Sequence, residues 1–142
     1  MPERRLDLCS LKVLSTPPYW KGKLLKAALP SIGLPGTPLK DRSLINAGNN
    51  FFKARLVERS LKANSQLVNE MPGSPLAARA LYNIADTYRR LAVYSEAARI
   101  YETFVSLQPN HELTEEALRY ATIFRTGLGE YDAAIKDLRK YL

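Results

Sequence analysis

The sequence holds few of the residues that most catalytic sites need. It contains one histidine, His111, and one cysteine, Cys9, so it can form neither a cluster of histidine metal ligands nor an intrachain disulfide. No run of 18 or more apolar residues occurs, which argues against a transmembrane helix. A phosphate-binding loop is not indicated, because Gly127-Leu-Gly129 lacks a third glycine and a preceding strand. These absences predict a protein that is not an enzyme and that needs no metal or cofactor.

Basic charge and proline are concentrated at the start of the chain. Residues 1–42 hold eight Lys or Arg against three acidic residues, so they carry +5 of the net charge of +7, and they hold six of the nine prolines. We interpret them as a basic, proline-rich leader that is partly disordered or ordered by a partner. The segment Pro17-Pro18-Tyr19-Trp20, with the lysines after it, leaves contact with an anionic membrane surface open, whereas nucleic-acid binding is less favoured.

Residues 43–142 form a helical body that repeats with a period of 37 residues. The shift relates residues of the same or similar type, among them Leu44, Leu81 and Leu118, Phe51 and Tyr88, Tyr94 and Tyr131, and Pro72 and Pro109. Periods of this length are typical of stacked supersecondary units, which bury their apolar faces against one another. The expected units lie at about 43–73, 75–110 and 114–142.

Within each unit, apolar residues recur at the three- and four-residue spacing of an amphipathic helix. The fold class is therefore all-α, an α-solenoid of about three helix-turn-helix repeats. The spacing predicts helices over 43–54, 57–71, 75–91 and 95–107, one that begins at 114, and one that runs from 131 to the end.

Caps and turns are marked unevenly along the body. Ser74 and Ser95 are predicted to cap the two helices of the middle repeat, because a serine hydroxyl can accept from first-turn amides. Gly127 and Gly129 predict the last turn. The first turn, Lys53 to Leu56, is weakly marked because it contains neither Gly nor Pro.

The middle unit resembles a tetratricopeptide repeat. The residues that carry this resemblance are Leu81, Ile84, Ala85 and Tyr88 in the first helix, then Tyr94, Ala97, Tyr101, Phe104 and the closing Pro109. The resemblance extends over about residues 41–142, with a period three residues longer than the 34 usual in that family. It implies an α-solenoid that works as a non-enzymatic scaffold or adaptor for a protein or peptide.

The links between units also resemble those of one subclass of this family. Pro72-Gly-Ser-Pro and Pro109-Asn-His-Glu are similar to links in bacterial cell-envelope scaffolds, namely outer-membrane assembly lipoproteins, Tol-Pal coordinators and gliding-motility complexes. This resemblance implies the periplasm or cell envelope. The start of the sequence has no signal-peptide pattern, which favours the cytoplasm, so both compartments stay open.

The resemblance also implies a binding surface, because the first helix of each unit lines the inner, concave face in this family. Asn can pair with a peptide backbone, Tyr can pack on side chains, and Arg can bind carboxylates. A solvated face with internal ion pairs is the alternative. The predicted partner-binding residues are Asn46, Asn49, Phe52, Lys53, Arg79, Tyr82, Asn83, Asp86, Arg89, Arg90, Arg119, Tyr120 and Ile123.

The last helix carries apolar residues that no later helix covers in this sequence. Exposing a large apolar side chain forgoes about 1.5–3 kcal/mol of burial, so we expect this C-terminal edge to meet a second copy, a partner or the remainder of a larger assembly. Fraying of the last turn is the alternative. The predicted interface residues are Ile135, Leu138, Tyr141 and Leu142.

Overall fold

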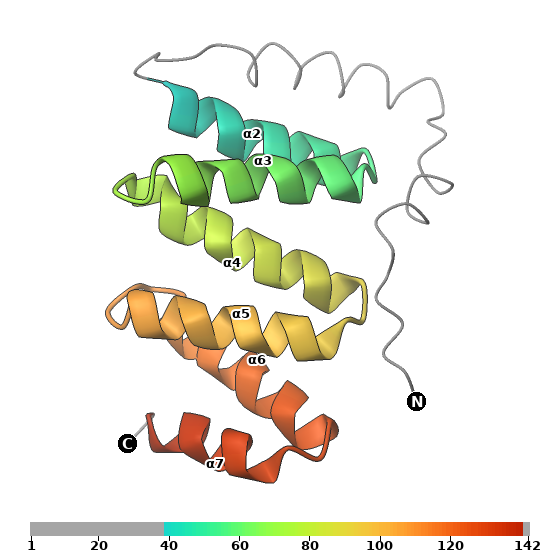
Figure 1. Cartoon of the computed structure of the whole chain (residues 1–142), viewed down its shortest axis with the longest axis vertical. Helices are drawn as coiled ribbons and strands as arrows, with labels where there is room; N and C mark the ends of the chain where they lie inside the picture. The colour runs from blue at the N-terminus through green and yellow to red at the C-terminus, as the bar shows by residue number, and fades with distance from the viewer. Residues whose placement is uncertain (1–38, 141–142) are drawn as a thin grey trace. The chain divides into compact units, whose positions relative to one another are not determined.

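The computed structural model describes residues 39–140, which form helices and connecting turns and, over that range, no strand (Figure 1). The predicted all-α repeat is confirmed, whereas the leader before residue 39, Tyr141 and Leu142 lie outside the described residues. No helix within 39–140 is long and apolar enough to cross a membrane. The helices are α2 (Lys40–Lys53), α3 (Val57–Glu70), α4 (Pro75–Arg90), α5 (Tyr94–Leu107), α6 (Thr114–Gly127) and α7 (Tyr131–Arg139).

The described part of the chain divides into two compact units, of which the first ends at Leu76 and the second begins at Ala77. In the described part of the first unit, α2 packs on α3 at a very close approach. A Cβ atom on Gly48 of α2 would lie 2.4 Å from Asn64 Nδ2 of α3. The Ser60 hydroxyl donates to the Gly48 carbonyl at 2.8 Å, and the Asn64 amide donates to the Ser60 carbonyl at 2.9 Å. Glycine is therefore needed at position 48 because α3 occupies the space of a side chain.

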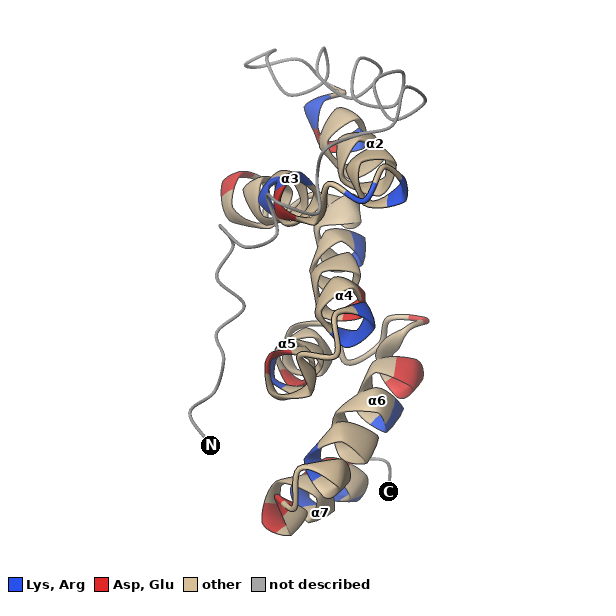
Figure 2. Ribbon diagram, turned by 90° about the vertical axis from the view of Figure 1, so that its right-hand side faces the viewer, with Lys and Arg blue, Asp and Glu red and all other residues tan. Residues whose placement is uncertain are grey.

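The second unit is built from α4 to α7, with α4 and α6 on one side and α5 and α7 on the other (Figure 2). Its centre is aromatic. Tyr101 and Phe104 of α5 are fully buried, and Tyr82 of α4 meets them edge-on, with ring centroids 5.4 and 5.8 Å away. Edge-on pairs of this kind add about 0.5–1.5 kcal/mol beyond burial. The aromatic rings thus fix α4 on α5.

The turn that joins the two helices has the same structure in each of the three helix pairs. Arg55, Ala92 and Gly129 stand 37 residues apart, and all three have a positive φ, of 59°, 59° and 77°. In the first turn the amide of Arg55 donates to Phe52 O at 2.9 Å and that of Leu56 to Phe51 O at 2.8 Å, and the other two turns repeat both bonds. This pattern is a Schellman motif, in which a left-handed residue ends the helix. The sequence predicted only the third turn clearly, because glycine holds the left-handed position in that turn alone of the three.

The two predicted serine caps differ in outcome. Ser74 precedes α4 and accepts from the Leu76 amide at 3.2 Å, as predicted, while its hydroxyl donates to the Asp41 carboxylate at 2.7 Å. Ser95 is not a cap, because α5 begins one residue earlier, at Tyr94, and no side chain caps it. The left-handed residue at the turn brings the chain into the helix before Ser95 is reached.

Candidate functional site

The side of the second unit formed by α4 and α6 carries a linked set of charged and aromatic side chains. Asp86 accepts from Arg89 Nε at 2.8 Å and from Arg90 Nε at 2.7 Å, at the i+3 and i+4 positions of the same helix. Arg89 also lies over the ring of Tyr120 on α6, with its Cζ 4.9 Å from the centroid. A guanidinium over an aromatic face is attracted by the ring, so Arg89 links the two helices.

Tyr120 is the centre of an aromatic stack. Its ring stacks on Phe124 in the same helix, at 5.9 Å, and on Tyr101 of α5, at 5.5 Å. Burial, followed by the charges nearby, raises the pKa of Tyr101. Tyr120 therefore contacts both the aromatic stack and the Arg89 guanidinium, and so ties Arg89 to the rings of α5 and α6.

The structure places Tyr82 in the core, although sequence predicted it on a binding surface. Its side chain is only 9% exposed, because it packs against the α5 rings. Burial, and then a hydrogen bond to the Glu116 carboxylate of α6, raise the pKa of Tyr82. Its hydroxyl therefore donates to Glu116, and its ring is not available to a partner.

The other predicted residues of α4 and α6 lie at the surface. Arg79 and Arg119 are exposed, Ile123 is 55% exposed, and Asn83 is half-buried and engaged in contacts. Arg119 lies 4.0 Å from Glu116, too far for a hydrogen bond, and 5.6 Å from the Tyr120 centroid. The surface set of this side is therefore basic: Arg79, Arg89, Arg90 and Arg119 against Asp86 and Glu116. We call this set the α4–α6 face.

The remaining predicted residues are distributed over α2 and α7. On α2, in the first unit, Asn46, Asn49 and Lys53 are exposed and Phe52 is half-buried. On α7, Ile135 and Leu138 are 47% and 49% exposed, as expected for an edge. That α2 and the α4–α6 face form one surface stays a prediction.

No group of three His, Cys, Asp or Glu side chains lies close enough to hold a metal ion within residues 39–140. His111 has a structural role, since its Nδ1 accepts from the Leu113 amide at 3.1 Å and its ring meets Phe104 edge-on at 5.3 Å.

Sequence reasoning missed one group of charged residues. Arg125 of α6 forms ion pairs with Glu102 of α5 and with Glu130, which directly precedes α7. Asp137 of α7 shares a side-chain hydrogen bond with Glu102. Three of these four residues occupy positions that are apolar or aromatic one period earlier. The 37-residue register could have found them, because it sets Arg125 against Tyr88 and Asp137 against Ile100.

The three helix pairs with a common turn define the chain as an all-α helical-repeat protein. Residues 78–111, which span α4, α5 and the link after them, match the family model of the tetratricopeptide repeat. The match supports the tetratricopeptide repeat family, whose members typically mediate protein–protein interactions and are typically not enzymes. A search of curated proteins finds no match to the chain.

Proposed function

We propose that the chain is a non-enzymatic adaptor that binds an extended, acidic peptide segment of a partner protein on its α4–α6 face. The observation that carries this proposal is the fixed position of Arg89, which is held by Asp86 on one side and by the Tyr120 ring on the other. A side chain that is ordered before binding loses less entropy when a partner arrives.

Charge complementarity selects the class of partner. The face holds four arginines and two acids, and Arg79 and Arg119 are exposed on α4 and α6. Arginine binds carboxylates through paired N–H donors, which favours Asp or Glu on the partner. The family match supports the same reading, since such repeats typically bind proteins.

The test compares labelled peptides on matched variants of the full chain. Fluorescence anisotropy would measure Kd for a fluorescein-labelled decapeptide of alternating Glu and Ser, with a Lys and Ser decapeptide as the control. We expect the acidic peptide to bind, and Arg79→Ala with Arg119→Ala to weaken it about tenfold. Arg99→Ala, an exposed arginine on α5, serves as the control and should leave Kd unchanged. Equal Kd values for both variants would contradict the proposal.

A second candidate function uses α7 as a docking edge in a larger assembly, of which a cell-envelope or membrane-associated complex is one kind. Tyr131, Ile135 and Leu138 recur at i, i+4 and i+7 and are 64%, 47% and 49% exposed. One period earlier, the position of Leu138 is Tyr101, which α6 covers.

Molar mass from light scattering over a concentration series tests this second function. We expect self-association of the full chain, and a folded monomer for Leu138→Asp. If the wild type and the Leu138→Asp variant are both well-folded monomers, α7 is not a self-association surface, and the α4–α6 face is left as the interaction site.

A further inference from the structure

The outer side of α7 carries an apolar stripe whose counterpart on α5 is covered by a helix. The members of this outer stripe, all exposed, are Tyr131, Ile135 and Leu138. One period of 37 residues earlier, the equivalent positions on α5 begin with Tyr94 and end with Tyr101. The ring of Tyr94 lies 5.0 Å from that of Phe124 on α6, between centroids, and the ring of Tyr101 lies 5.5 Å from that of Tyr120. The outer stripe of α7 therefore lies where a helix packs in the preceding repeat.

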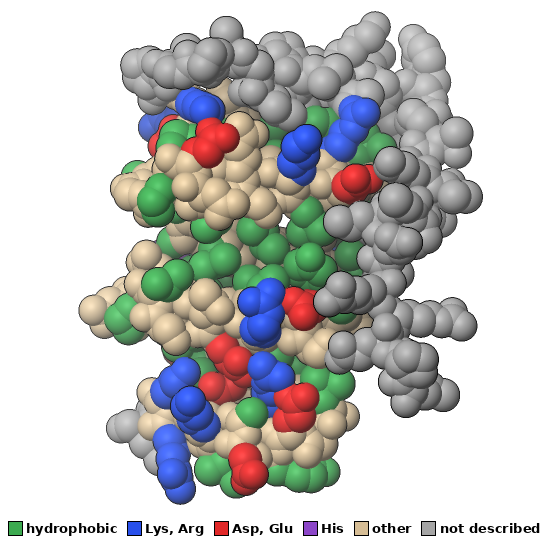
Figure 3. Space-filling model, viewed as in Figure 1, with side chains coloured by type: hydrophobic (Ala, Val, Ile, Leu, Met, Phe, Trp, Pro, Cys, Tyr) green, Lys and Arg blue, Asp and Glu red, His purple; other side chains and the backbone are tan. Residues whose placement is uncertain are grey.

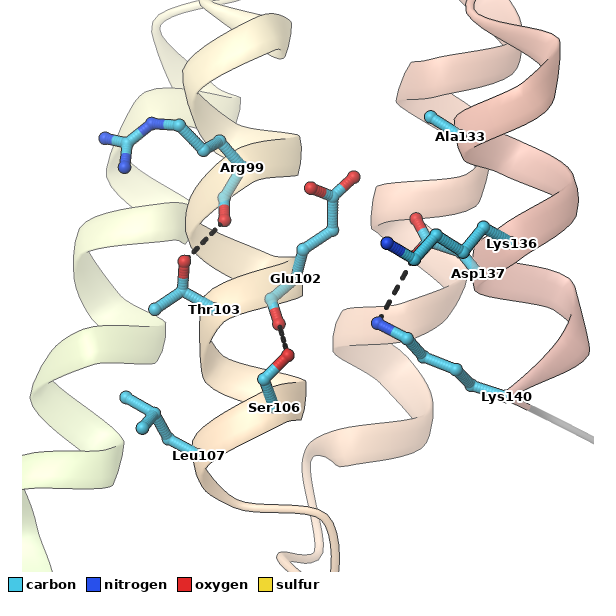
Figure 4. Close-up of a pocket in the computed structure, with 9 residues that line it drawn as sticks. All are labelled: Arg99, Glu102, Thr103, Ser106, Leu107, Ala133, Lys136, Asp137 and Lys140. Atoms are coloured by element: carbon cyan, nitrogen blue, oxygen red, sulfur yellow. Dashed lines mark hydrogen bonds and ion pairs between the residues drawn. The ribbon is translucent and has the colours of Figure 1, made fainter.

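The opposite side of α7 is engaged within the second unit. Ala134 and Asp137 are buried there, and Figure 4 shows Asp137 and Lys140 on the side of α7 that faces Glu102 of α5. Asp137 shares a side-chain hydrogen bond with Glu102, and Lys140 Nζ lies 3.6 Å from Asp137 Oδ1. Figure 3 shows apolar side chains along the lower edge of the view, over α7. The outer stripe is therefore the side of α7 that is left for a partner.

Two side chains of opposite charge flank the outer stripe. Asp132 directly follows its first member and Arg139 its last. The two stand seven residues apart, about two helical turns, so they lie on the same side of α7. Both are exposed, and neither side chain makes a hydrogen bond or an ion pair among the described residues. Each suits its own end of the helix dipole, but the dipole does not require them to share a side. They are thus available to a partner that carries the opposite charges in the reverse order.

We propose that the outer stripe of α7 packs antiparallel against the same stripe of a second copy of this chain, about a two-fold axis at Ile135. This pairing rests on the self-association through α7 proposed above and gives it a geometry. Ile135 is the middle residue of α7, so it meets itself at the axis. In the same register, Tyr131 lies beside Leu138 of the second copy, and Asp132 lies beside Arg139 of the second copy. One register thus covers all members of the stripe and forms an ion pair on each side of the axis.

The charges and the neighbouring repeat both favour the antiparallel direction. In an antiparallel two-fold pair, the same side of both helices meets with its order reversed, so the acidic end of one helix lies beside the basic end of the other. A parallel pair would bring the like-charged ends together. The consecutive helices α5 and α6 also run antiparallel (Figure 1). A second α7 in this direction therefore repeats the packing of α6 on α5.

The helix α2 of a second copy is a poorer occupant of the stripe. A head-to-tail contact would place α2 on α7 as α6 is placed on α5. Two periods before Tyr120 and Phe124, however, α2 carries Asn46 and Asn50. Placing these amides on the outer stripe would bury polar groups against apolar side chains, which is unfavourable. A head-to-tail contact also repeats without closing, whereas a two-fold pair is complete with two copies.

The experiment is sedimentation equilibrium of the full chain with Cys9→Ser, which excludes a disulfide-linked dimer. A contact between two nine-residue helices is small, so we expect a dimer with a Kd of about 10–100 μM. Asp132→Arg and Arg139→Asp should each weaken this dimer about tenfold, because each sets like charges against one another on both sides of the axis. An equimolar mixture of the two variants should recover the original affinity, since every facing pair is then of opposite charge. Glu112→Arg, which reverses an exposed charge in the link after α5, is the control and should leave Kd unchanged.

A cross-linking measurement tests the axis without changing these charges. Ile135→Cys, added to Cys9→Ser, should give a disulfide-linked dimer on mild oxidation, because this position meets itself across the axis. Lys136→Cys places the thiol on the next exposed residue, which projects to another side of α7, and should cross-link far less. If either single charge variant loses its far-UV circular dichroism, the double variant Asp132→Arg with Arg139→Asp takes its place and should dimerise with the original affinity.

The outcomes separate this pairing from the self-association on which it rests. A chain that stays monomeric at every concentration would overturn both, and would leave the outer stripe to another segment or another protein. A dimer whose charge variants do not recover on mixing, or that cross-links equally at positions 135 and 136, would overturn the antiparallel pairing alone.

Discussion

Replacing Gly129 by alanine is expected to destabilise the second unit, whereas the same replacement two residues earlier, at Gly127, is expected to stabilise it. Both glycines lie at the turn between α6 and α7, and an added Cβ at either would meet no atom within 4 Å. They differ in backbone conformation, because Gly129 has a φ of +77° and Gly127 is the last residue of α6. Any difference between the two variants therefore reports the backbone and not packing.

The magnitude follows from opposing terms. An L-residue in the left-handed region loses about 1–2 kcal/mol, while replacing glycine recovers about 0.4–1 kcal/mol of unfolded-state entropy. Gly129→Ala should therefore lower the free energy of unfolding by about 1 kcal/mol. Gly127→Ala should raise it by about 0.5–1 kcal/mol, because helical alanine is favoured over glycine.

The middle turn should show the opposite effect. Ala92 holds the equivalent left-handed position with a φ of 59°, so Ala92→Gly should raise the free energy of unfolding by about 0.5–1 kcal/mol. Urea denaturation followed by far-UV circular dichroism measures all three variants against the wild type. If Gly129→Ala and Gly127→Ala shift the midpoint in the same direction, the repeated left-handed turn is not the feature that ends these helices.

Three further predictions concern buried polar contacts, each measured as the free energy of unfolding in urea. Gly48→Ala should destabilise the first unit by about 1–3 kcal/mol, because the new methyl would lie 2.4 Å from Asn64 Nδ2, while Gly73→Ala, in open space, should change little. Arg125→Met should destabilise the second unit by about 2–3 kcal/mol, since it removes the two hydrogen bonds that Arg125 donates to Glu102, and adding Glu102→Gln should recover part of that loss. Asp137→Asn should stabilise the chain at neutral pH by about 1 kcal/mol, because it removes a buried charge. Since the pKa of Asp137 is raised in the folded state, the wild type gains stability as the pH falls toward that pKa. The difference in the free energy of unfolding between the variant and the wild type should therefore shrink on acidification. A difference that stays constant with pH would refute this prediction.

The helices were predictable from the sequence because their apolar residues keep a strict spacing over several turns. Each predicted boundary lies within about three residues of the observed one, and the period of 37 residues reappears in the turns themselves. The first turn was hard to find because its left-handed residue is Arg55. An arginine disfavours the left-handed conformation, so the residue type at position 55 does not predict this turn. The flanking Ala54 and Leu56 are buried in an apolar cluster between α2 and α3, and this packing holds the turn in place.

The candidate site was predictable only in part, because periodicity assigns a residue to a helix side but not to a depth. Tyr82 and Arg79 lie on the same helix, yet only Tyr82 turns into the aromatic core. The network around Asp137 was not predicted, for another reason. A charge on a helix reads as solvent-exposed unless its position is compared with the same position in the other repeats.

The aromatic stack gives the second unit an optical signal of its own. Tyr82, Tyr101 and Tyr120 are held in contact across α4, α5 and α6, whereas residues 39–76 contain neither tyrosine nor tryptophan. Near-ultraviolet circular dichroism of tyrosine arises from rings held in a fixed asymmetric environment. In a variant whose Tyr19 and Trp20 are replaced by phenylalanine, its loss during denaturation would therefore follow the second unit, while the far-ultraviolet signal follows the helices of both. A gap between the two curves would show that the units unfold separately.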